Sequence, residues 1–92
     1  MNLSDDATFT PSENVTWRKI DNDNIVVLKL ETGEYFTFND LGRILWQEFA
    51  ADKTFAQIVQ TVVDTYDVDK TQAKNDIMNF AARLLQDGVL AE

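Results

Sequence analysis

Glu31-Thr32-Gly33-Glu34-Tyr35-Phe36-Thr37-Phe38-Asn39-Asp40-Leu41-Gly42 is the stretch that decides the fold of this 92-residue chain. It predicts a turn at Gly33, a short aromatic strand over residues 35–38, and a helix that Asn39 or Asp40 caps. We expect this strand to be the last of a small sheet and to lie at its edge. It carries no lysine or proline to discourage pairing, and such an edge either aggregates or binds an extended peptide.

Two further strands are predicted before this stretch. Residues 15–20 alternate apolar and polar side chains, and residues 25–30 form a β-branched run typical of a central strand. Asn and Asp residues at 21–24 predict the turn between them. Two tight connections in a row predict an antiparallel sheet with the second strand in the middle. Because the first strand carries Arg18 and Lys19, the third strand is the better docking edge.

Helical periodicity replaces strand alternation after residue 39. Apolar residues between Leu41 and Phe49 share one face, and Thr54 is placed to cap a second helix that reaches Tyr66. A third helix is predicted from about Thr71 to the Asp87-Gly88 pair, where Gly88 suits a left-handed cap. Its stripe of Ala73, Ile77, Phe80 and Leu84 is expected to face the core, with Lys74, Met78, Ala81 and Leu85 on a neighbouring stripe.

These elements define the predicted organisation of the chain. Residues 15–92 form one α+β domain, with a three-stranded antiparallel sheet followed by a three-helix, winged-helix-like bundle. Residues 1–14 hold the only proline and show no periodicity, so we expect a mobile N-terminal arm.

Composition excludes several classes of chemistry. The chain has no cysteine and no histidine, so disulfides, thiol nucleophiles and histidine-based acid–base or metal sites are absent. No carboxylate pair lies in an apolar context that would raise its pKa, and the acidic residues near Asp64 lack calcium-loop spacing. We expect no enzyme activity, no metal and no cofactor. We also expect a cytoplasmic protein, since neither a signal peptide nor a membrane-spanning run is present.

The net charge of −8 bears on the alternatives. A winged-helix transcriptional module needs phosphate attraction, which an acidic domain does not supply, so we expect no nucleic-acid partner. An anionic membrane surface is disfavoured for the same reason. A structural homodimer that pairs through the strand at residues 35–38 stays open as an alternative to peptide binding, although we expect a monomer.

The order of several short motifs resembles a known family. Gly33 to Asn39 is followed by Gly42-Arg43-Ile44-Leu45-Trp46, then by Asp76-Ile77-Met78-Asn79-Phe80, and finally by Leu84 to Leu90. This order is similar to that of the PqqD-like proteins, the precursor-peptide recognition elements of ribosomal natural-product pathways. Residues 31–33 and 50–53 depart from the usual family motifs, which indicates a divergent member from a lasso-peptide or other peptide-maturation cluster.

The resemblance implies a non-catalytic adaptor. Family members bind the leader of a precursor peptide, which adds to the third strand and lies against the third helix. They deliver it to a maturation enzyme such as a radical SAM enzyme or a leader peptidase. The peptide-binding residues expected here are Glu34, Tyr35, Phe36, Thr37 and Phe38 on the strand and Lys74, Ile77, Met78, Ala81 and Leu85 on the helix.

Overall fold

The computed structural model of the chain describes residues 4–92, and its centre is a three-stranded antiparallel sheet. The strands are β2 (Val15–Lys19), β3 (Asn24–Lys29) and β4 (Tyr35–Asn39), in the spatial order β2-β3-β4. This confirms the predicted sheet, with the β-branched strand in the middle and β4 at an edge. In the described part of the chain, β4 pairs only with β3.

Both turns of the sheet follow from their residue types. The Asp21 carboxylate accepts hydrogen bonds from the backbone N–H groups of Asp23 and Asn24 at 2.8 and 2.9 Å. These bonds favour the charged form, so the pKa of Asp21 is lowered from its ordinary value. The second turn contains Gly33 at φ 75°, a left-handed conformation that glycine adopts without a steric penalty.

Alternation along the strands gives the sheet two different faces. The inner face carries Trp17, Val27 and Phe36 in one row and Ile25 and Phe38 in the next. Ile25 and Val27 are fully buried there. The outer face is uncovered, and the side chain of Tyr35 on it is 72% exposed.

Three helices follow the sheet: α1 (Asp40–Ala50), α2 (Phe55–Thr65) and α3 (Lys70–Gln86). Thr54 caps α2 as predicted, in a reciprocal arrangement with Gln57. The side chain of Asp69 caps α3 by accepting from the Gln72 N–H at 2.8 Å. Asn39 stands at the cap position of α1, where its side chain makes no cap hydrogen bond.

The core forms where the inner face of the sheet meets α1 and α3. Trp46 and Phe49 of α1 are completely buried. Trp46 packs against Phe38 at a ring-centroid distance of 5.7 Å and against Trp17 at 6.1 Å. Aromatic burial therefore joins α1 directly to β2 and β4.

The N-terminal segment differs from the sequence prediction. Residues Thr10–Pro11 form β1, which pairs antiparallel with β5 (Leu90–Ala91) near the C-terminus. Phe9 is only 2% exposed and packs edge-on against Phe49 at 5.6 Å. The Phe55 N–H also donates to the Ala7 carbonyl at 2.7 Å. The prediction of a mobile arm is therefore wrong for residues 4–14, and residues 1–3 lie outside the described part.

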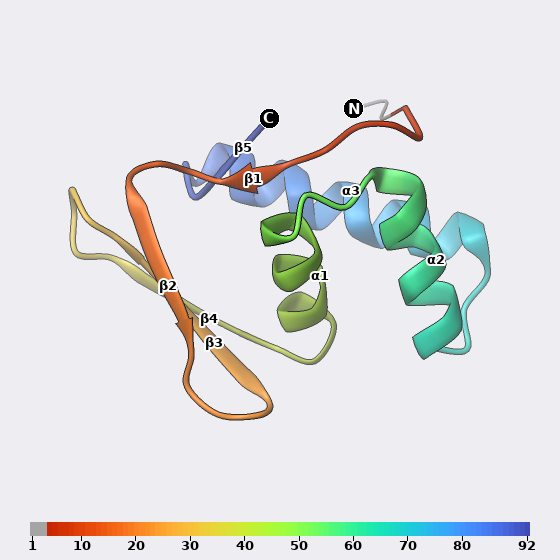
Figure 1. Cartoon of the computed structure of the whole chain (residues 1–92), viewed down its shortest axis with the longest axis horizontal. Coiled ribbons are helices and arrows are strands. Elements are labelled where there is room, and N and C mark those ends of the chain that lie inside the picture. The colour runs from red at the N-terminus through yellow and green to blue at the C-terminus, as the bar shows by residue number, and fades with distance from the viewer. Residues whose placement is uncertain (1–3) are drawn as a thin grey trace.

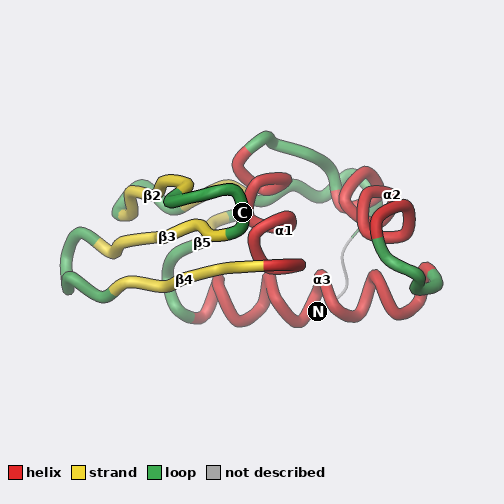
Figure 2. Tube along the Cα trace, turned by 90° about the horizontal axis from the view of Figure 1, so that it is seen from below, coloured by secondary structure: helices red, strands yellow, loops and turns green. Residues whose placement is uncertain are grey.

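The whole arrangement is α+β, as predicted from the sequence. The sheet lies on one side of the helices, and α3 runs behind α1 and α2 in Figure 1. Turned by 90°, β4 is the strand of the three-stranded sheet that lies nearest α3 in Figure 2. Among residues 4–92, no helix has the length and apolar character needed to cross a membrane.

Candidate functional site

The free edge of β4 offers unpaired backbone groups. In an antiparallel ladder, hydrogen-bonded and non-hydrogen-bonded pairs alternate. The Lys29 N–H donates to the Glu34 carbonyl at 2.8 Å, which fixes the phase of the β3–β4 ladder. Phe36 and Phe38 therefore direct their backbone groups toward β3. Tyr35, Thr37 and Asn39 direct theirs outward, along the free edge.

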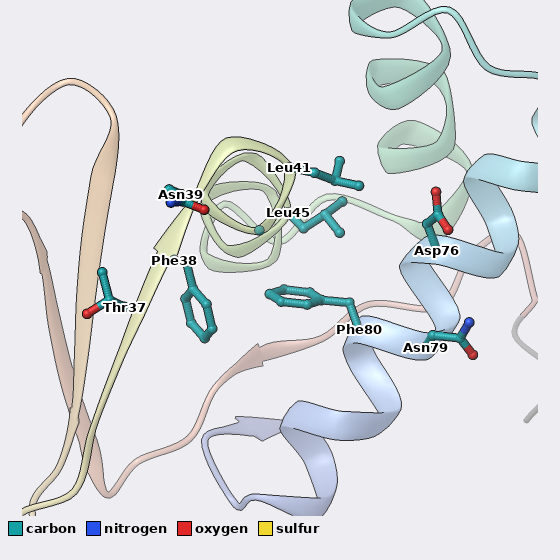
Figure 3. Close-up of a pocket in the computed structure, with 9 residues that line it drawn as sticks. Thr37, Phe38, Asn39, Leu41, Leu45, Asp76, Asn79 and Phe80 are labelled. Carbon is teal, nitrogen blue, oxygen red and sulfur yellow. The ribbon is translucent and has the colours of Figure 1, made fainter.

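A hollow of about 480 Å³ lies beside the Asn39 end of this edge. Phe38 and Phe80 reach toward each other from β4 and α3, and Leu41 and Leu45 project from α1 beside them (Figure 3). Gly42 also lines the hollow, and a Cβ at that position would lie 3.6 Å from the Phe80 ring. The glycine therefore leaves open a space that a larger side chain would fill.

A second hollow of about 190 Å³ lies beside the Phe36 end of β4. The two hollows share Thr37, Phe38 and Phe80 as lining residues, so they form one depression along the strand. We call it the β4–α3 groove. Its residues are Phe36, Thr37, Phe38 and Asn39 of β4, Leu41, Gly42 and Leu45 of α1, and Asp76, Asn79, Phe80, Arg83, Leu84 and the adjoining Asp87 of α3.

The floor of the groove is aromatic and held in place by packing. Phe80 contacts Phe38 edge-to-face at a centroid distance of 5.3 Å and stacks on Phe49 at 6.3 Å. Phe38 in turn rests on the buried Trp46. A floor fixed by three ring contacts is preformed, so a ligand does not bear the entropic cost of ordering it.

The polar residues of the groove lie along α3. Asp76 and Asn79 line the Asn39 end, whereas Arg83 and Asp87 line the Phe36 end. The Asp76 carboxylate accepts a hydrogen bond from the Gln72 side chain at 2.8 Å. In the described residues, the ion pair between Lys29 and Glu34, at 3.8 Å, is the single one recorded, so none involves these α3 side chains.

The predicted strand residues lie at this site in two groups. Phe36, Thr37 and Phe38 line the groove itself. Tyr35 does not line the groove; its side chain points to the outer face of the sheet and its backbone groups lie on the free edge. Glu34 lies at the turn, where its carboxylate is 3.8 Å from the Lys29 ammonium group.

The predicted helix residues lie elsewhere on α3. Ile77 and Ala81 are 0% exposed and belong to the core, so neither offers surface to a ligand. Met78 and Leu85 pack partly against the core. Lys74 lines a small separate hollow with residues of α2 and Asp5. None of these five lines the groove within residues 4–92.

The predicted helix residues lie away from the groove because the other flank of α3 faces β4. The buried stripe on α3 has two flanks, and the groove was predicted on the flank that holds Lys74 and Met78. The structure turns the other flank toward β4, with Asp76, Phe80 and Arg83 on it. Gly42, in the first turn of a predicted helix, where most other residues favour the helix more, was the available signal of a close aromatic neighbour.

A wider, shallower hollow of about 660 Å³ covers the outer face of the sheet, over Thr16, Arg18, Val26, Leu28 and Tyr35. It lies over a face of the sheet, on β2, β3 and β4, and not along the free edge of β4. Groups of carboxylates arranged to hold a metal ion are absent from residues 4–92. The β4–α3 groove, which adds a free edge to an apolar floor, is therefore the stronger candidate site.

The comparison with protein families bears on this geometry. The family model described as coenzyme PQQ synthesis protein D (PqqD) matches residues 24–90, which include β3, β4 and all three helices. The chain belongs to the PqqD family. This confirms the resemblance drawn from the sequence. No curated protein matches the chain significantly.

Two solved structures share the fold of this PqqD-family chain. One, described as TbiB1 in complex with the TbiA(beta) leader peptide, is 28% identical, with a TM-score of 0.83 over 88% of this chain and 93% of that one. The other, a lasso peptide synthetase B1 complexed with the leader peptide, is 23% identical. Its TM-score is 0.84, over 94% of this chain and 100% of that one.

Proposed function

We propose that this protein is a non-catalytic adaptor that binds the leader of a ribosomally made precursor peptide. The leader adds as a strand to the free edge of β4 and lies over the groove. The observation that carries the proposal is the outward ladder of Tyr35, Thr37 and Asn39 beside a preformed apolar floor. The two structural relatives, each described with a leader peptide bound, support it.

In strand addition, the backbone and the side chains make different contributions to binding. Backbone hydrogen bonds to the β4 edge supply affinity for any extended peptide. Successive side chains of an added strand point to opposite faces, so every second one enters the groove. The aromatic floor at Phe38 and Phe80 then selects which peptides bind.

The second half of the proposal is presentation to a maturation enzyme. A peptide in the groove leaves the outer face of the sheet uncovered, including the exposed side chain of Tyr35. The alternate side chains of the added strand would extend this face. An enzyme that docks here would contact adaptor and leader together.

The alternatives have less support. A transcriptional winged helix is opposed by the net charge of −8, because phosphate attraction supplies most non-specific DNA affinity. A homodimer through the β4 edge uses the same ladder. Measurement of the molecular mass in solution separates it from the adaptor, which is expected to be a monomer.

The test is a titration of isotope-labelled protein with the leader of a precursor peptide from the same gene cluster. We expect amide shifts on residues 35–39 and 76–87. Hydrogen exchange gives the sharper readout: the amides of Tyr35, Thr37 and Asn39 gain protection, whereas Phe36 and Phe38 are already bonded to β3.

A scrambled leader of the same composition is the control and is expected to give small, dispersed shifts. Shifts confined to α2, or unchanged exchange at all three outward amides in a saturated complex, would rule out strand addition at this edge.

A further inference from the structure

The Asn39 end of the groove has an unusual balance of apolar and charged groups. Phe38, Leu41, Leu45 and Phe80 make its floor and walls. Among the described residues that line this end, Asp76 is the single charged one. A carboxylate at the rim of an aromatic hollow suits a side chain with an apolar stem and a cationic head.

We infer that Asp76 selects a lysine or arginine of the bound peptide. The inference rests on the proposed function and deepens it, because it names a residue that determines which leaders bind. The stem of the guest side chain lies on Phe38 and Phe80, and its head pairs with the Asp76 carboxylate. A cation close to an aromatic face gains further from the ring quadrupole.

Asp76 has the capacity for this partner. One of its oxygens, Oδ1, accepts from Gln72 at 2.8 Å, and an ionised carboxylate offers about four lone-pair sites in all. No Lys or Arg lies within ion-pair distance of Asp76 in the part of the chain that the structure describes. Asp76 is partly buried, so a guest cation beside it would be screened less than at an open surface.

The surroundings at this end do not cancel the negative charge. Helix α1 begins here, and its N-terminus carries a partial positive charge. Asp40 in the first turn of α1 offsets that charge. The Phe36 end is different, because Arg83 and Asp87 both line it and their charges oppose each other. The preference for a cation is therefore local to the Asn39 end.

Strand geometry fixes the sequence distance between the cationic residue of the peptide and the next side chain that enters the groove. Side chains that enter the groove are two residues apart, or about 6.6 Å along an extended strand. The hollow at the Phe36 end is lined by Phe36, Phe80 and Leu84 as well as the opposed charges. We therefore expect a Lys or Arg two residues from an apolar side chain.

The test needs no knowledge of the natural leader. A phage library of random peptides is selected against the purified full-length protein. The same library is selected against Asp76→Lys, and against Asp64→Lys as a matched control. Asp64 also accepts from a glutamine one turn before it at 2.8 Å, but on α2. Both substitutions change the net charge from −8 to −6.

The expected result is a Lys or Arg enriched at one position by the wild type and by Asp64→Lys, replaced by Asp or Glu with Asp76→Lys. For a selected peptide, Asp76→Asn keeps an acceptor for Gln72 and is expected to weaken binding about 3- to 20-fold. Asp64→Asn leaves the affinity unchanged. Circular dichroism establishes that each variant is folded.

The other outcomes overturn the inference in distinguishable ways. Enrichment of a motif without a cation, or of the same motif by Asp76→Lys, removes the role of Asp76 and leaves peptide binding intact. An equal change with both lysine variants assigns the preference to the overall field of the protein. Failure of every selection, with no peptide bound by the wild type, contradicts the inference and the proposed function together.

Discussion

Thr37 is the residue at which backbone and side-chain roles separate most clearly. Its N–H and carbonyl point outward from the free edge, while its side chain points to the outer face of the sheet, away from Phe38 and Phe80 (Figure 3). A residue in this position contributes to binding through atoms that every amino acid except proline possesses. Its importance therefore cannot be judged from the threonine side chain.

Thr37→Pro is expected to weaken peptide binding by about 1–3 kcal/mol, because the substitution removes one outward donor. The bonds of β4 to β3 run through Phe36 and Phe38 and are kept. Isothermal titration calorimetry with a leader or a library-selected peptide measures the loss.

Thr37→Val is the matched control, since it keeps the N–H and nearly the same shape; its affinity is expected to stay close to that of the wild type. Equal affinity of a folded Thr37→Pro variant would place the peptide away from this edge.

Among the elements, helix α3 shows most clearly which features the sequence predicts and which it does not. Its approximate bounds and its buried stripe follow from periodicity, because Ala73, Ile77 and Leu84 can only face a core. The flank that meets β4 does not follow, since both flanks mix small, apolar and polar side chains. The choice depends on the hand with which the helix packs beside the sheet, which is a property of the tertiary structure.

The other elements also fall into two groups: those that local residue types predict, and those that depend on contacts distant in the sequence. The turn at Asp21 and the cap at Thr54 rest on local hydrogen bonds, so residue types alone predicted them. Strands β1 and β5 have two residues each, too few to show alternation. Their pairing joins residues 10 and 91, a contact that no local pattern specifies.

Ala81→Arg tests the orientation of α3. Because Ala81 is fully buried, the arginine would overpack the core and bury an unpaired charge. We expect the free energy of unfolding to fall by at least about 3 kcal/mol, measured by urea denaturation.

Ala82→Arg, one position along on a half-buried site, is expected to cost less than about 1 kcal/mol. A stable Ala81→Arg variant that loses only peptide binding would instead place Ala81 in the groove.

In the whole molecule, β1 near the N-terminus and β5 near the C-terminus pair with each other and complete the fold. Phe9 fills a place beside Phe49 in the core, and β1 ties the N-terminal segment to β5. Residues 4–14 are therefore a structural part of the domain. A chain of 92 residues has a modest core, so the burial of Phe9 from a segment without periodicity adds to its stability.

Phe9→Ala is expected to lower the free energy of unfolding by about 3–5 kcal/mol, as for other buried phenylalanines. Chemical denaturation followed by circular dichroism measures the change. Thr8→Ala serves as the control, because Thr8 is exposed and its substitution is expected to be nearly neutral. An unchanged unfolding midpoint in Phe9→Ala would restore the mobile arm predicted from the sequence.

The contact between Trp46 and Phe38 gives the protein an optical property. Trp46 is 0% exposed, and its indole N–H has no hydrogen-bond partner among the described residues, so its fluorescence comes from an apolar, rigid site. Trp17, the second tryptophan, is partly exposed and packs edge-on against it. Because Phe38 is at once the neighbour of Trp46 and the floor of the groove, any displacement of that ring alters the emission of a buried fluorophore. The intrinsic fluorescence of Trp46 therefore reports whether the groove is occupied.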